Sequence, residues 1–387
     1  LHDARRLGDL AGEFDRFLAR ADPALYGRFD SYRQASGSLG PVDESNLLIA
    51  VARHLSRFVG LLFDIGGLQK RDAEEARGQE PIFAFKRDFL QRRVLKKYRP
   101  GAGPAESFAG LDGRVRTLRR ALFSEIDFTP DPELGTARMV VELMSLQSQL
   151  TEVVRLKRAA EVPAAAAHRL QELRDRLPEV PGILPVSGAT GAGADLAFVE
   201  GALALLEDWC AARLQDPAGL AEVRGWVSYR FPEEMDYQHL VRLERPEPDL
   251  PEAIRGPREK LRRRDGFKLT DPRMSPREVL DHAHYCVLCH DRDKDSCSKG
   301  FRDKTGGYRK NPLGIALKGC PLDQKISEAH ALKRQGDSLA ALAVICVDNP
   351  MLPGTGHRIC NDCMKGCIFQ KQEPVNIPQI ETGILTD

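Results

Sequence analysis

The sequence predicts an all-α protein, and three observations favour helices over strands. Apolar residues recur every three or four positions in several long stretches, which is the spacing of one face of a helix. Alternating runs of Val, Ile, Thr and Tyr bounded by hairpin turns, which would indicate strands, are missing. The cysteines near the carboxyl end are separated by a helical segment and lack the knuckle glycines of a zinc ribbon.

Four stretches before residue 270 carry the helical pattern most clearly. Their periodic residues are Leu10, Phe14, Phe17 and Leu18; Leu48, Ala52, Leu55, Val59 and Leu62; Met139, Leu143, Leu146 and Leu150; and Leu196, Val199, Leu203, Leu206 and Trp209. Gly66-Gly67 predicts the end of the second helix, and Pro- and Gly-rich breaks follow at 100–104 and 181–193. We expect a helical region of unknown role over residues 1–180. A second helical region with a linker is expected over 195–268, with Cys210 as a packed core thiol.

The glycine-rich run from Gly188 to Asp195 invites comparison with a nucleotide-binding loop. A GxGxxG pattern would place its third glycine where Leu196 stands, and Pro181 and Pro185 interrupt the strand that should precede it. We interpret the run as a loop in which Asp195 caps the following helix.

Composition predicts a soluble protein in a reducing compartment. Lys and Arg total 57 against 56 Asp and Glu, so the overall charge favours neither nucleic acid nor an anionic membrane as a partner. The most apolar segment, Leu47–Ile65, contains two arginines and a histidine and is not expected to span a membrane. No signal peptide is visible, and eight of the nine cysteines cluster between Cys286 and Cys367. We therefore expect metal ligands in the cytoplasm rather than disulfides.

Seven of the clustered cysteines have spacings typical of metal ligands. They form Cys286-x2-Cys289-x7-Cys297, then Cys320-Pro321, and, after a helical segment that contains Cys346, Cys360-x2-Cys363-x3-Cys367. CxxC and CxxxC spacings allow one short loop to supply two or three ligands of a cubane cluster, which a distant residue completes. Proline after a ligand redirects the chain and starts the next helix.

Two other interpretations of these cysteines remain open at this point. The two CxxC pairs would suffice for a structural zinc site in an interaction or scaffold protein, but zinc leaves Cys297, Cys320 and Cys367 unexplained. Cys286 to His290 also matches CxxCH, the attachment motif of c-type haem, but haem would make the other clustered cysteines redundant.

A pair of helices is predicted between the two cysteine groups. The pattern indicates helices over Leu322–Leu332 and Ser338–Cys346, with a small apolar core formed by Ile326, Leu332, Leu339, Leu342 and Ile345. Gly336 should end the first helix, Asp337 or Ser338 should cap the second, and Asn349-Pro350 should stop it.

A combination of motifs in the last quarter of the chain is specific enough to indicate a family. The motifs are CVLC, GCPL, GDSLAALAVI, DNP, GHRIC, CMKGC and PVNIPQIE. Together they resemble the N-terminal helical ferredoxin-like domain of the glutamate synthase small subunit. The same module occurs in dihydropyrimidine dehydrogenase and related FAD-dependent NAD(P)H oxidoreductases. The resemblance implies an α-helical ferredoxin-like domain with two [4Fe-4S] clusters over residues 270–387 and does not cover residues 1–270.

The resemblance also implies a ligand set that interleaves along the chain. One cluster would be bound by Cys286, Cys289, Cys297 and Cys367, and the other by Cys320, Cys360, Cys363 and Glu381. The carboxylate of Glu381 is a harder donor than a thiolate, so the two clusters should differ in reduction potential. Asn361 stands where the family has a proline, and fewer residues separate Cys360 from Cys363 than in the family. Cys346 is therefore the alternative to Cys363 as a ligand.

These implications describe the electron-transfer portion of an FAD-dependent NAD(P)H oxidoreductase, with no catalytic residue for bond chemistry in this chain. Four histidines flank the ligands and are expected either to hydrogen-bond around them or simply to be exposed: His282, His284, His290 and His357. No GxGxxG motif follows the ligands, so the flavin is expected after residue 387 or on a partner flavoprotein subunit. The start at Leu1 favours a fragment.

The spacer between Cys297 and Cys320 is strongly basic. Within Ser298–Gly319, six cations stand against the single acid Asp303: Lys299, Arg302, Lys304, Arg309, Lys310 and Lys318. This charge suits an acidic partner such as ferredoxin, and it also suits a solvated loop.

Overall fold

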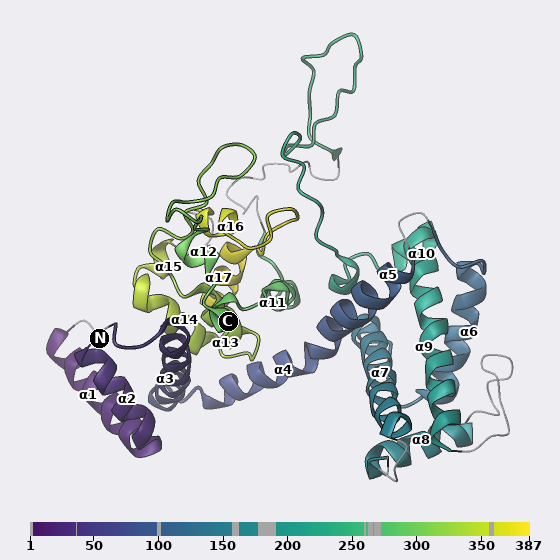
Figure 1. Ribbon diagram of the computed structural model, residues 1–387, viewed down its shortest axis with the longest axis horizontal. Helices are drawn as coiled ribbons and strands as arrows, with labels where there is room; N and C mark the ends of the chain where they lie inside the picture. Colours follow the sequence, from purple (N-terminus) through teal and green to yellow (C-terminus); the bar gives the residue numbers. More distant parts are fainter. Residues whose placement is uncertain are drawn as a thin grey trace. The chain divides into compact units, whose positions relative to one another are not determined.

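The computed structural model describes residues 3–35, 37–98, 102–156, 162–176, 191–258, 261, 266, 272–355 and 360–387. These residues form helices joined by turns and loops, which confirms the all-α prediction (Figure 1). Strand-like pairing within these ranges is confined to four isolated bridges. None of the described helices is both long enough and apolar enough to cross a bilayer.

Contacts divide the chain into two compact units. One unit is formed by Leu1–Arg77 together with Pro232–Asp387, and the other by Gly78–Phe231. The expected ranges 1–180, 195–268 and 270–387 follow other boundaries. The difference arises because the helices at the start of the chain pack with the cysteine-rich region at its end.

The unit Gly78–Phe231 is built on two long helices, α7 (Pro132–Leu156) and α9 (Ala192–Gln215), which pack on each other. Its other elements are the end of α4 (Gly66–Ala84), the π-helix η1 (Phe85–Val94), α5 (Leu95–Lys97), α6 (Phe108–Leu122), α8 (Ala164–Arg176), α10 (Pro217–Glu222) and the 3-10 turn η3 (Val227–Tyr229). Trp209 is fully buried in its core and donates a 3.0 Å hydrogen bond from Nε1 to Asp112. The adjacent Cys210 is fully buried, as predicted.

Two predicted helix boundaries are wrong. Helix α9 begins at Ala192 after Gly191, so Asp195 lies buried in its first turn instead of capping it. Gly191 adopts a φ of 112°, a conformation that glycine tolerates and that allows the chain to enter the helix earlier. Gly66 begins α4, because α3 has already ended at Leu62. The rest of the glycine-rich run, up to residue 190, lies outside the described residues.

The unit that contains the eight clustered cysteines has two apolar cores among its described residues. Helices α1 (Ala4–Ala21), α2 (Pro23–Gln34) and α3 (Pro41–Leu62) share the first, which includes Phe14, Leu18 and Leu47. The second core includes buried cysteines and lies among the later helices. These are α11 (Pro276–Tyr285), η5 (Cys289–Arg292), α12 (Ser296–Lys299), α13 (Ile326–Lys333), α14 (Ser338–Asp348), α15 (Leu352–Thr355), α16 (Asp362–Lys365) and α17 (Ile377–Thr386).

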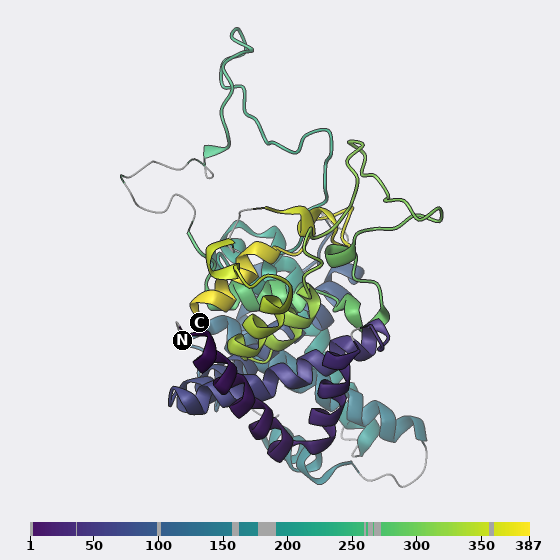
Figure 2. The same cartoon turned by 90° about the vertical axis from the view of Figure 1, so that its left-hand side faces the viewer.

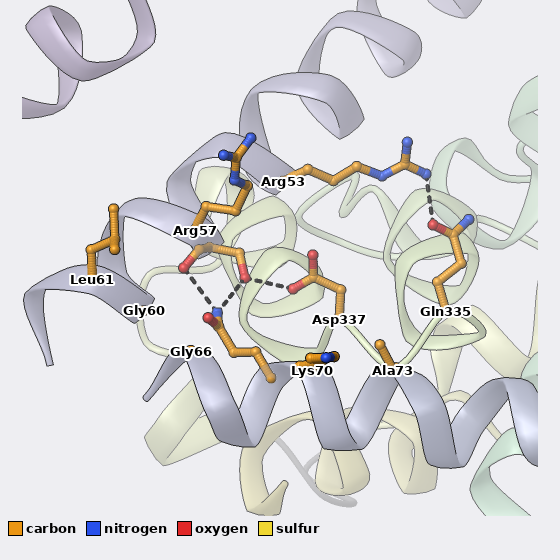
Figure 3. A pocket seen from close by; sticks show the side chains of 12 residues that line it. Arg53, Arg57, Gly60, Leu61, Gly66, Lys70, Ala73, Gln335 and Asp337 are labelled. Carbon is orange, nitrogen blue, oxygen red and sulfur yellow. Dashed lines mark hydrogen bonds between the residues drawn. The ribbon is translucent and has the colours of Figure 1, made fainter. Parts of the chain in front are cut away.

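Helix α3 joins the two cores through buried polar contacts. The Ser45 hydroxyl donates to the Glu328 carboxylate of α13 over 2.7 Å, and the Ser56 hydroxyl donates to Asp337, ahead of α14, over 2.6 Å. Gln69 of α4 donates to both the hydroxyl and the carbonyl of Ser56. A pocket of about 510 Å³ opens beside these contacts, and no cysteine lines it (Figure 3).

The predicted helix pair is confirmed as α13 and α14. Asp337 is the N-cap of α14 and accepts a 3.0 Å hydrogen bond from the Ala340 N–H, and Asn349 follows the last turn. Gly336 has the positive φ of 75° that a chain needs to leave a helix. Helix α13 begins at Ile326 rather than Leu322, because the chain turns at residues 321–322 and is not yet helical over 323–325.

Candidate metal centre

The first predicted ligand group is assembled from several short elements. Cys286 ends α11, Cys289 begins η5, Cys297 lies in α12 and Cys367 follows α16, and all four are buried. Burial raises the pKa of Cys286 to about 12, and the charges of Cys367 and Cys289 act in the same direction. Burial also raises the pKa of Cys297, as do Asp295 and the other three thiols. The four thiols therefore lie close enough to affect one another's pKa values.

Main-chain N–H groups lower the pKa values of two thiols in this group. Against the effect of burial, the Leu288 N–H lowers the pKa of Cys286. Burial likewise raises the pKa of Cys367, and three N–H groups that follow it in the chain, among them that of Phe369, lower it. Such donors favour the thiolate, which is the form of cysteine that binds metals.

Aromatic rings and one arginine border the first group. The rings of Tyr285 and Phe369, which lie close to Cys286 and Cys367 in sequence, stack with centroids 4.3 Å apart. The Arg334 guanidinium donates to the carbonyl oxygens at the end of α11, including that of Ala283 over 2.7 Å. Its charge opposes the effect of burial on the pKa of Cys286.

Members of the second predicted group also affect one another's pKa values. Cys320 and Cys363 are buried, Cys360 is exposed, and Glu381 lies half-buried in α17. Burial raises the pKa of Cys363, and the charges of the other three members act in the same direction. Burial raises the pKa of Cys320 as well, while two main-chain N–H groups of the following turn oppose it. Burial raises the pKa of Glu381 to about 7.

The two groups meet through their backbones. The Cys320 N–H donates to the Cys297 carbonyl over 2.9 Å, which joins one member of each group. A Cβ atom on Gly366 would lie 2.7 Å from the Ser296 carbonyl oxygen and 2.9 Å from the Cα of Gly319. Only glycine permits this approach at position 366 without a shift of the neighbouring backbone.

Cys346, the alternative ligand, and His282 make contacts outside the two predicted ligand groups. Cys346 is half-buried in α14, and its pKa is raised by burial, with no contribution from another thiol. His282 accepts a 3.3 Å hydrogen bond at Nδ1 from the Asn376 N–H. His357 lies outside the described residues, as does most of the GHRIC motif. Within the described ranges, no group of three or more His, Cys, Asp or Glu side chains is arranged to hold a metal ion.

Sequence reasoning missed two features of the site. Ser327 of α13 lies 2.7 Å from His290 Nδ1 and donates to Asp295 over 2.9 Å, which ties the segment between Cys289 and Cys297 to α13. This contact leaves no local pattern. The second missed feature is the close approach of Gly366 to Gly319, and it did leave a pattern. Lys-Gly-Cys occurs at both Cys320 and Cys367.

Comparisons with known proteins give relatives without an assigned function. The family model of the RP005 N-terminal alpha-helical domain matches residues 1–64. Uncharacterized protein RP005 of Rickettsia prowazekii (strain Madrid E) is 26% identical over 329 residues, which cover 82% of this chain and 90% of that protein. Uncharacterized protein RP006 of the same organism is 68% identical over 37 residues, which cover 10% of this chain and 5% of that protein. No solved structure matches.

Proposed function

We propose that residues 286–381 hold two [4Fe-4S] clusters and transfer electrons to or from a flavin. The observation that carries the proposal is the grouping of the thiols. The pKa values of Cys286, Cys297 and Cys363 respond to the charges of residues that the family resemblance assigns to the same cluster, and this supports the assignment. Sequence separation alone would not produce this interleaving, since Cys367 joins Cys286 and Cys320 joins Cys363.

The donor set fits iron–sulfur clusters. Cysteine thiolates are the usual ligands of such clusters, and a cubane holds its four ligands further apart than a single ion does, because irons and sulfides lie between them. When bound, the clusters would supply one-electron transfer. The chain's own part would be to favour thiolates through main-chain donors, and to exclude water with the apolar core that includes Cys286, Cys297 and Cys367.

The remaining parts of the proposal rest on the resemblance. FAD and NAD(P)H would bind after residue 387 or on a partner flavoprotein, and bond-breaking chemistry would take place there. A reducing compartment such as the cytoplasm would keep these buried thiols free for iron.

The test is the metal and sulfide content of anaerobically purified protein, together with its visible spectrum. We expect about eight irons with matching sulfide per chain, and a broad brown absorption that bleaches on reduction. Zinc without iron or sulfide would refute the proposal and favour an interaction or scaffold protein stabilised by zinc.

Variants test the assignment of ligands to clusters. Cys289→Ala should lose about half of the iron and Glu381→Ala should perturb only the EPR signal of the other cluster, while the matched control Cys346→Ala should keep both signals. Loss of both signals in each ligand variant, with unchanged circular dichroism, would contradict the interleaved assignment.

A further inference from the structure

We propose that the segment Ser298–Gly319, here called the basic arm, is the docking surface for an acidic electron-carrier protein. This inference rests on the proposed function, because it names the partner from which the clusters would receive electrons, or to which they would pass them. Figure 2 shows the arm, drawn in green, extending away from the helices of its unit.

The basic arm has a defined backbone and is not a loose loop. Three backbone hydrogen bonds, each of 2.9 Å, join three segments of the arm. The Phe301 N–H donates to the Leu317 carbonyl, the Arg309 N–H to the Phe301 carbonyl, and the Leu317 N–H to the Arg309 carbonyl. Two turns close the arm. The Asp303 carboxylate accepts from the N–H groups of residues 305 and 307, and the Asn311 side chain accepts from those of residues 313 and 315.

The positive charge of the arm is not neutralised by neighbours. All six cations are exposed, and none of them forms an ion pair with another described residue: Lys299, Arg302, Lys304, Arg309, Lys310 and Lys318. The single acid, Asp303, is occupied by the hydrogen bonds of its own turn. The arm therefore presents a concentrated positive field that would attract an acidic surface.

The base of the arm is attached to both ligand groups. Cys297 and Cys320 flank the arm directly, and a 2.9 Å hydrogen bond from the Cys320 N–H to the Cys297 carbonyl joins their backbones. A recess of about 710 Å³ lies between the arm and the segment that follows Cys367, and its lining includes Phe301, Leu317 and Phe369. A protein seated on the arm would thus lie beside a ligand of the first group.

The surface chemistry favours a protein over a nucleic acid. Leu313 and Ile315 are 52% and 44% exposed at the second turn, and such apolar residues among cations suit the mixed character of a protein interface. Nucleic-acid grooves combine cations with free aromatic rings on which bases stack. Here the guanidinium of Arg302 covers Tyr308 at 4.0 Å, and Arg309 lies over Phe301 at 5.7 Å.

The electron transfer itself balances simply. In each encounter the reduced carrier loses one electron and the cluster site of this chain gains it, and the reverse direction balances in the same way. Association would be weak and steered by charge, as is usual for redox encounters.

The experiment measures electron transfer from a reduced acidic [2Fe-2S] ferredoxin to the anaerobically purified full chain by stopped flow, across a series of salt concentrations. The test variant is Lys304→Glu with Lys310→Glu. The control is Arg5→Glu with Arg6→Glu, which makes the same charge change at exposed positions of α1. At low salt we expect the second-order rate constant of the test variant to fall about tenfold and the control to keep its rate, with the difference disappearing at high salt.

Two further measurements separate the possible failures. Iron content and reduction by dithionite are determined for every variant, because a chain without clusters refutes the proposed function itself. Intact, dithionite-reducible clusters that react with ferredoxin equally fast in all variants, or not at all, would refute the docking surface alone. Tight binding of a labelled single-stranded oligonucleotide that is lost in the test variant would overturn it in favour of nucleic acid.

Discussion

Replacing Asp337 by alanine should destabilise the cysteine-containing unit, because this one carboxylate makes two contacts. It caps α14 through the Ala340 N–H and accepts the Ser56 hydroxyl of α3 (Figure 3). Loss of an N-cap costs about 1 kcal/mol, and a hydrogen bond to a charged acceptor contributes about 2 kcal/mol. After the substitution Gln69 still donates to the Ser56 oxygen, but the Ser56 hydroxyl proton loses its acceptor. We expect a loss of about 2 to 3 kcal/mol in the free energy of unfolding.

Denaturant unfolding of the full chain measures this loss with two probes. Both tryptophans, Trp209 and Trp226, lie in the unit Gly78–Phe231, so their fluorescence reports that unit, whereas far-UV circular dichroism reports all helices. Asp337→Ala should move part of the circular dichroism transition to lower denaturant and leave the fluorescence transition in place.

A double-mutant cycle isolates the contact between α3 and α14. Asp337→Asn keeps an acceptor at the cap and should cost less than Asp337→Ala. The effects of Ser56→Ala and Asp337→Ala should fall short of additivity by about 1 kcal/mol. Additive effects would refute the hydrogen bond between these side chains, and with it the idea that α3 stabilises the cysteine region through Asp337.

Three other substitutions test separate parts of the structure. Gly366→Ala should lower the free energy of unfolding by about 1 to 3 kcal/mol and lower the iron content of both ligand groups, because its Cβ would meet backbone. The control in metal analysis is Gly67→Ala, because a Cβ at Gly67 would enter open space. Burial holds the pKa of Glu328 above its usual range, so its ionisation destabilises the fold as pH rises. The free energy of unfolding of Glu328→Gln, relative to that of the parent, should therefore be higher at pH 8 than at pH 5. Chemical unfolding at both pH values measures it. Arg334→Ala should destabilise the end of α11, seen as faster amide exchange at residues 283–286, since three carbonyls lose their donor.

The sequence predicted best what short segments determine by themselves. The cap at Asp337, the chain's exit from the first helix by Gly336 and the stop at Asn349 follow from the chemistry of single residues within one turn, and all three are present. The boundaries at Asp195 and Gly66 were wrong because glycine started a helix where a polar cap or a stop was expected.

Contacts between distant segments could not be predicted in this way. Ser45 and Glu328 form a buried hydrogen bond across most of the chain, yet neither residue belongs to a recognisable motif. Their pairing depends on how α3 packs against α13, which is a property of the folded unit. The grouping of Cys367 with Cys286 was expected only because of the family resemblance, since CxxC spacing says nothing about which distant thiol completes a site.

The backbone contact between the two ligand groups, at Cys297 and Cys320, determines what each kind of substitution can show about the proposed clusters. A ligand variant such as Cys289→Ala removes a side chain and leaves the hydrogen bond from the Cys320 N–H to the Cys297 carbonyl in place, so the second group keeps its geometry. A Cβ at Gly366 instead displaces backbone that both groups share. Separate losses in ligand variants together with a joint loss in Gly366→Ala would therefore mean two clusters on one common support. A joint loss in every variant would mean that the cysteines serve a single structural site.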